Sequence, residues 1–301
     1  MEQKNVTASQ PLITVLGGTG PIGAAYNDEF LKQGVRLRIL ARSPERIRER
    51  FPQAEVIPGS MLSPEKVSQA MEGADAAFLI APLAGGGDTS IGFEAARVAI
   101  AAARQTRLPH LIFMSSLAPT QRPSYATLDA KHEIEAMMGA SAVPWTSLRC
   151  GSLMEDWLGY APWLLKRGFY FLPLDGNHIS HFTSQQDVAR VVCTLVRSKR
   201  VINGPLDVID PNRRNMFQVA DAVGKVLKRK VFHVGHALLP LLRLLRPTLF
   251  RFYWRTVGTK VIILNYFEKH DFVGDSEQLG KVLPDFKVTT LEAYLEKAFN
   301  A

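Results

Sequence analysis

The sequence predicts an α/β fold, in which a doubly wound parallel sheet is followed by a smaller C-terminal lobe. Short apolar, β-branched runs alternate with helical patterns at least five times before about residue 150. This alternation is typical of parallel strands joined by crossover helices. A glycine cluster follows the first apolar run directly. Beyond about residue 150 the segments become longer, less regular and richer in aromatic residues.

The expected elements follow one another with clear boundary signals. Gly34 is typical of a helix C-terminus, and Ser63 followed by Pro64 suits a helix N-terminus. The alternation in Val35–Ala41 indicates a strand. Strands are expected at 11–16, 35–41, 55–57, 76–80, 111–114 and 145–149, and helices at 22–33, 43–51, 63–71, 91–106 and 128–138.

Composition excludes several classes of protein. The chain has 301 residues, of which 47% are hydrophobic, enough to bury a large core. Cys150 and Cys193 stand in no CxxC or His-paired pattern, which argues against a disulfide framework and a structural zinc site, and no metal is expected. The polar start of the sequence lacks a signal-peptide core, and no apolar run reaches ~18 residues. A cytoplasmic protein is therefore expected.

The formal charge of +8 is concentrated in one segment. Residues 222–267 contain nine Lys and Arg residues and no acid, and residues 231–267 interleave arginine with leucine and aromatic side chains. This pattern suits lobe helices with solvated arginines, a lid over an apolar acidic substrate, or peripheral contact with an anionic membrane; the first two are favoured. Nucleic-acid binding is disfavoured because the sequence contains no recognisable module for it. The oligomeric state stays open.

The glycine cluster at Gly17–Gly23 carries the main functional signal. It satisfies GxGxxG through Gly18, Gly20 and Gly23, and GxxGxxG when Gly17 replaces Gly18. One glycine permits the tight turn, one lets the backbone approach a pyrophosphate, and one lets helix and strand pack closely. The helix N-terminus then offers free N–H groups to the anion. The sequence therefore predicts that a dinucleotide binds here.

The end of the second strand indicates which dinucleotide. A site that prefers NAD places Asp or Glu there to hold the ribose hydroxyls. The chain instead has Arg42 and Ser43, and no acid before Glu45. Arg42 can pair with a 2′-phosphate, Ser43 can donate to it, and Arg46 stands one turn later. NADP(H) is therefore favoured as the cofactor, the alternative being that Arg42 is simply a surface residue.

Several motifs along the chain together resemble one known family, the NmrA-like atypical short-chain dehydrogenases. The resemblance extends to about residue 297 but does not cover 231–270 well. The motifs are GGTGPIG at 17–23, LARSPER at 40–46, IPGS at 57–60, AFLIAP at 77–82, IFMSS at 112–116, DAKHEIE at 129–135, WTSLRCGSLMEDW at 145–157, QDVA at 186–189 and TLE at 290–292.

The resemblance implies a Rossmann NAD(P)-binding domain over residues 1–155 and a substrate lobe over 156–301, parts of which pack back on the main sheet. NADP(H) would lie between them. The implied cofactor contacts are Gly17, Thr19, Gly20, Pro21, Ile22 and Gly23 to pyrophosphate and ribose; Arg42 and Ser43 to the 2′-phosphate; Ser60 and Met61 to adenine; Ala81, Pro82 and Ser115 on the nicotinamide side; and the backbone of Gly151, Ser152 and Leu153 to the carboxamide. The family usually has Asp where Ser60 stands and Pro where Cys150 stands.

The catalytic residues depart from the usual pattern. In ordinary short-chain dehydrogenases a Tyr exchanges a proton with the substrate, and a Lys four residues later lowers the Tyr pKa. Lys131 occupies the Lys position, but Thr127 stands where the Tyr is expected. Three alternatives remain for protonation of the substrate. Lys131 itself could be the donor, Tyr125 could donate from a preceding loop, or the acceptor could need no side-chain acid. Ser115 is a further donor candidate. Lys131 would otherwise hold the nicotinamide ribose.

The sequence thus predicts an NADPH-dependent oxidoreductase. It would transfer a hydride to a small, largely apolar carbonyl, imine or quinone-like substrate, with the cofactor supplying the chemistry. The missing Tyr leaves two alternatives open. One is a non-catalytic NADP(H)-binding redox sensor or regulator, and the other is an isomerase or cyclase that uses the same fold.

Overall fold

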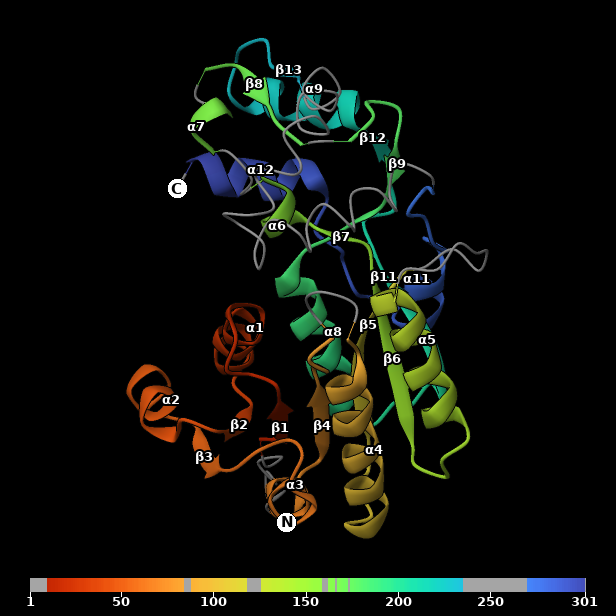
Figure 1. The fold of residues 1–301 in the computed structure, drawn as a ribbon. Helices are drawn as coiled ribbons and strands as arrows, with labels where there is room; N and C mark the ends of the chain where they lie inside the picture. Colours follow the sequence, from red (N-terminus) through yellow and green to blue (C-terminus); the bar gives the residue numbers. More distant parts are fainter. Residues whose placement is uncertain are drawn as a thin grey trace, which may run out of the picture.

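The computed structural model describes residues 10–83, 88–117, 126–158, 162–165, 167–172, 174–234 and 270–300. Its centre is a seven-stranded sheet of order β11-β6-β5-β4-β1-β2-β3 (Figure 1). All six strand pairs in this sheet are parallel. The strands are β1 (Leu12–Leu16), β2 (Arg36–Ala41), β3 (Glu55–Pro58), β4 (Ala76–Leu79), β5 (Leu111–Ser116), β6 (Trp145–Cys150) and β11 (Gly204–Val208).

Helices cover both faces of the sheet, because its central strands are apolar on both sides. The alternate side chains Ile13 and Val15 of β1 belong to one core cluster, and Leu12 and Leu16 belong to the other. The first face is covered by α1 (Pro21–Lys32), α2 (Pro44–Arg50), α8 (Gln185–Arg197) and α11 (Gln278–Val282). The second is covered by α3 (Pro64–Met71), α4 (Ser90–Gln105) and α5 (Ala126–Gly139).

A smaller lobe with its own apolar core lies beyond the carboxyl ends of the strands (Figure 1). Helix α9 begins with a complete capping box, in which the side chains of Asn215 and Gln218 each bond the other's backbone N–H. The strands of the lobe pair as β7 (Ser152–Leu153) with β10 (Phe182–Thr183), β9 (Ile179–Ser180) with β12 (Arg214–Asn215), and β8 (Phe169–Tyr170) with β13 (Phe232–His233). Its helices are α6 (Met154–Leu158), α7 (Pro162–Leu165), α9 (Met216–Val226) and α12 (Leu291–Asn300).

The predicted α/β fold is confirmed, and each strand and helix predicted in the first half is present with ends within two residues. The sequence did not locate the elements of the second half. Among these, β11 joins the main sheet beside β6, and α8 packs on the same face as α1. Within the described ranges, no helix is both long and apolar enough to cross a membrane. Most of the basic segment 231–267 lies outside those ranges.

Candidate cofactor site and active site

The predicted cofactor residues gather at one edge of the main sheet. Since β1 to β6 run parallel, their carboxyl ends meet at this edge, facing the lobe (Figure 1). The strand order changes direction between β1 and β4, and such a switch point is where open α/β sheets bind ligands. The residues that directly follow the six strands are Gly17, Arg42, Gly59, Ile80, Leu117 and Gly151.

Gly17 and Gly23 shape the turn between β1 and α1. Gly17 has φ +91°, a conformation that L side chains rarely adopt, and a Cβ there would collide with the carbonyl oxygen of Ile80. A Cβ on Gly23 would lie 2.5 Å from the Cα of Gly18. These glycines are therefore required for the chain to turn at the switch point and for α1 to pack against the turn.

Gly20 has a different surrounding, which fits an anionic ligand. A Cβ on Gly20 would meet no protein atom within 4 Å, so the backbone there faces open space. Gly20 is the N-cap of α1, and no side chain caps the helix. The first N–H groups of α1 are thus left for a ligand, as a pyrophosphate requires.

Asn27, which was not predicted as a site residue, holds this turn in place. Its side-chain Nδ2 donates to the carbonyl oxygen of Gly18 over 2.9 Å, and the residue is fully buried. A buried polar side chain in a helix usually has such a partner. Its position one turn after Gly23, on the otherwise apolar face of α1, was the signal in the sequence.

Arg42 and Ser43 lie exposed where β2 ends. The first acid after them, Glu45, is on α2 and forms an exposed ion pair with Arg48 at 3.8 Å. The strand end therefore presents a guanidinium and a hydroxyl, and no carboxylate at the position that would bind ribose hydroxyls. At the neighbouring strand end, Ser60 and Met61 are half-buried, and Ser60 Oγ accepts from the N–H of Leu62 over 3.2 Å.

At the carboxyl end of β6, the predicted nicotinamide side, two backbone donors are already used within the protein. The N–H of Gly151 donates to Thr183 Oγ1 over 2.8 Å, and the N–H of Ser152 donates to the His181 carbonyl over 2.9 Å. These bonds join β6 to the lobe. The contacts from residues 151–153 to the nicotinamide carboxamide stay a prediction. Because the N–H groups of Gly151 and Ser152 are already bonded within the protein, these two residues would have to contact the carboxamide through other groups.

Thr127 and Lys131 lie on α5, close to the end of β4 and the end of β6. Thr127 Oγ1 donates to the carbonyl of Leu83 over 2.9 Å, so it ties α5 to the segment after Ala81 and Pro82. Lys131 is half-buried. Burial lowers the pKa of its amine, while the nearby Cys150 and Glu135 oppose that effect. Tyr125, the other candidate proton donor, lies outside the described residues.

The two cysteine side chains and His181 are buried within the protein. Cys150 and Cys193 are free and buried, and burial raises the pKa of each thiol to about 12. His181 is buried, and its Nδ1 accepts from the N–H of Gly274 over 3.1 Å. The described parts of the chain contain no group of three or more His, Cys, Asp or Glu side chains suited to a metal ion.

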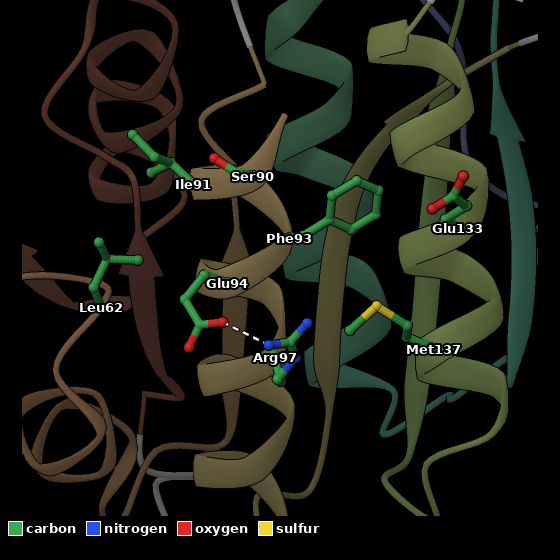
Figure 2. A pocket seen from close by; sticks show the side chains of 8 residues that line it. All are labelled: Leu62, Ser90, Ile91, Phe93, Glu94, Arg97, Glu133 and Met137. Atoms are coloured by element: carbon green, nitrogen blue, oxygen red, sulfur yellow. Dashed lines mark hydrogen bonds and ion pairs between the residues drawn. The ribbon is translucent and has the colours of Figure 1, made fainter. Parts of the chain in front are cut away.

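A groove lies along α4 and α5, and no residue of the glycine turn lines it (Figure 2). Its volume is about 750 Å³. It includes the ion pair of Glu94 with Arg97 at 2.8 Å. None of the predicted cofactor residues lines it; its lining is Leu62, Ser90, Ile91, Phe93, Glu94, Arg97, Glu133 and Met137.

The sequence matches the model of the NAD(P)H-binding family over residues 17–199, more than half of the chain. The match begins at the first glycine of the turn.

Two curated reductases are also similar. One is (4-alkanoyl-5-oxo-2,5-dihydrofuran-3-yl)methyl phosphate reductase of Streptomyces griseus subsp. griseus, 30% identical over 158 residues, which are 52% of this chain. The chain spans about half the length of that relative (53%). The other is the NAD(P)H azoreductase of Xenophilus azovorans, 23% identical over 228 residues, which cover 75% of this chain and 78% of the relative.

A solved structure shares the fold over nearly the whole chain. It is an NADPH-dependent quinone oxidoreductase from Escherichia coli in complex with NADPH, with a TM-score of 0.75 and 19% identity. The alignment covers 96% of this chain and 100% of the oxidoreductase. At this identity the likeness establishes the common fold.

Proposed function

This chain belongs to the NAD(P)H-binding family, and we propose that it is an NADPH-dependent oxidoreductase that reduces a small, largely apolar carbonyl, imine or quinone-like substrate. The observation that carries the proposal is the open backbone at Gly20 at the start of an uncapped α1. The exposed Arg42 and Ser43 at the next strand end support NADPH over NADH.

Each part of the edge has a role in this proposal. Reduced nicotinamide supplies the hydride when the cofactor is bound. The N-terminus of α1 holds the pyrophosphate, and Arg42 with Ser43 holds the 2′-phosphate. Lys131 binds the nicotinamide ribose and supplies a proton to the reduced substrate.

The substrate class is proposed from two supports. The similar proteins are named as a reductase of an alkanoyl-oxo-dihydrofuranylmethyl phosphate, an azoreductase and a quinone oxidoreductase. The second support for this substrate class is the replacement of the usual proton donor. Thr127 replaces the usual Tyr and donates to Leu83, so an acceptor that needs little acid assistance suits this site.

The same Thr127 contact favours a second candidate function. A protein that binds NADP(H) without turning it over would respond to the redox state of the pool by changing conformation, and would need no proton donor. The two candidates differ in turnover, because only the enzyme consumes NADPH.

The test is NADPH oxidation by the purified protein with a panel of quinones, aldehydes and imines, followed by absorbance of the reduced nicotinamide. We expect turnover with at least one acceptor and a loss of about 100-fold or more in kcat/KM in Lys131→Ala if it is the acid. Tyr125→Phe measures the contribution of the alternative donor. Lys281→Ala, which removes an exposed lysine of α11 paired with Glu277, is the matched control and should match the wild type.

Tight NADPH binding without oxidation by any acceptor would contradict the enzyme and support the sensor. Equal turnover in Lys131→Ala, Tyr125→Phe and the wild type would show that neither residue supplies the proton.

A further inference from the structure

A row of polar side chains crosses three strands of the otherwise apolar sheet. Ser115 of β5 pairs with Arg149 of β6, and Arg149 pairs with Asp207 of β11. Residues paired in this way point to the same face of a sheet. Polar groups at such buried positions need partners, and here the partner comes from the helix that covers this face.

That partner is Glu135 on α5. Its Oε1 accepts from Ser147 Oγ over 2.6 Å, and its Oε2 accepts from the Arg149 Nη2 over 2.5 Å. Arg149 Nε bonds both carboxylate oxygens, at 3.1 and 3.2 Å. Burial alone would raise the pKa of the Glu135 carboxyl, but the bonds from Arg149, Ser147 and Ser115 outweigh it and hold the pKa below its usual value. Glu135 is therefore a buried carboxylate ion.

Lys131 lies four residues before Glu135, on the same face of α5. The charged and titratable groups that act on its amine are Glu135 on its own helix and Cys150 on β6. Because burial raises the pKa of the Cys150 thiol to about 12, that thiol is neutral at physiological pH. Among the described residues that act on this amine, Glu135 is the one that carries negative charge. Its own neighbours are His132 on α5, whose Nδ1 lies 3.8 Å from Glu135 Oε2, Arg149 on β6 and, beyond it, Asp207 on β11.

We propose that Glu135 is a positioning residue, held by Arg149 and Ser147, that keeps the Lys131 side chain charged and directed to the cofactor edge of the sheet. The proposal rests on the function proposed above in giving Lys131 its role toward NADPH. For the protein without cofactor, the proposal concerns only the charge of Lys131. Arg149 moderates the effect, since its positive charge opposes that of Glu135 at Lys131.

The rival explanation is that the Glu135–Arg149 pair only fastens α5 to β6. The two explanations differ in sign. A fastening role makes Glu135→Gln and Arg149→Gln equivalent, because each breaks the same pair. The positioning role makes them opposite, because one variant removes a negative charge near Lys131 and the other removes a positive charge.

The experiment measures the pH midpoint of Lys131 by competitive acetylation of the folded protein, with the labelled peptide quantified by mass spectrometry. We expect Glu135→Gln to lower the midpoint by about one pH unit and Arg149→Gln to raise it. Glu135→Asp, which keeps a carboxylate, should restore most of the wild-type value. The matched control is Glu133→Gln on the same helix, whose side chain lines the outer groove (Figure 2), and it should not move the midpoint.

If Glu135→Gln does not fold, the double variant Glu135→Gln/Arg149→Gln, which removes both charges, takes its place. The sign of the midpoint shift in Arg149→Gln then still distinguishes the two explanations. Shifts of the same sign in Glu135→Gln and Arg149→Gln, or a midpoint unchanged in both, would overturn the proposal. The measurement needs no turnover, so it can succeed or fail independently of the reductase proposal. Protection of Lys131 from acetylation by NADP⁺ is a separate readout that tests the cofactor role alone.

Discussion

The glycines of the turn after β1 serve different purposes, which a single motif conceals. Gly17 is needed by the fold, because its φ is +91° and the Ile80 carbonyl occupies the place of a Cβ. Gly20 is in an extended conformation, with φ −82° and ψ 172°, which any residue adopts. Nothing in the protein fills the space beside it. We therefore expect its lack of a side chain to matter for the proposed ligand and not for folding.

This difference predicts opposite outcomes for two identical substitutions. Gly17→Ala should reduce the free energy of unfolding by about 1–3 kcal/mol, because a strained backbone and a steric clash are added. Gly20→Ala should leave stability within about 0.5 kcal/mol and weaken NADPH binding by about tenfold or more, because its methyl group projects toward the pyrophosphate. Chemical denaturation and a fluorescence titration measure the two effects. A Gly20→Ala protein that binds NADPH like the wild type would contradict the pyrophosphate site.

At the scale of elements, β5 and β6 are joined by a buried side-chain contact as well as by the sheet. His110, immediately before β5, lies 2.8 Å from Thr146 Oγ1 of β6 through its Nε2. Thr146 Oγ1 already accepts from the N–H of Ile202. Its hydroxyl proton is thus free to bond a neutral imidazole, and burial lowers the pKa of His110 to about 4.

The depressed pKa of His110 predicts a loss of stability in acid. The unfolded chain binds a proton at His110 near pH 6.5, whereas the folded chain does so only near pH 4. The unfolded state therefore binds more protons between these values, and the contribution of His110 to the free energy of unfolding falls as pH drops through that window, by about 3 kcal/mol in all.

Denaturant unfolding at a series of pH values checks this prediction when the wild type is compared with His110→Gln, which cannot titrate. The slope of the unfolding free energy between pH 4 and 6.5 should be smaller in the variant. Identical slopes in the two proteins would show that His110 titrates alike in the folded and unfolded chains.

The sequence predicted the elements of the first half because each is bounded by a strong local signal. Pro21, Pro44 and Pro64 occupy the first turns of α1, α2 and α3, and Gly34 has a positive φ just after α1. After residue 150, α8 and α9 have N-caps at Ser184 and Asn215, but the strands of the lobe are only two residues long, too short to show an alternating pattern. β11 contains Pro205 and Asp207, which are unusual in a sheet. Contacts with β6 and α11 place β11 in the sheet, and contacts between such distant parts of the chain cannot be predicted from the local sequence.

At the scale of the whole molecule, the parallel sheet brings together residues that are far apart in the chain. Parallel strands place their carboxyl ends at one edge, so a sequence that predicts strand order also predicts which loops meet. The Gly17–Gly23 turn and Arg42 could be predicted in this way. Glu135 and Asn27 could not, because their roles depend on side-chain partners such as Arg149 and the Gly18 carbonyl.

Paired binding titrations test most directly the proposed preference of this edge for NADPH over NADH through Arg42. The wild type, Arg42→Ala and the control Arg48→Ala, which alters an exposed arginine of α2, are each titrated with NADPH and NADH. We expect the wild type and Arg48→Ala to prefer NADPH. Arg42→Ala should lose about 10–100-fold in affinity for NADPH, with little change for NADH. A wild type that prefers NADH, with neither affinity changed in Arg42→Ala, would contradict the account.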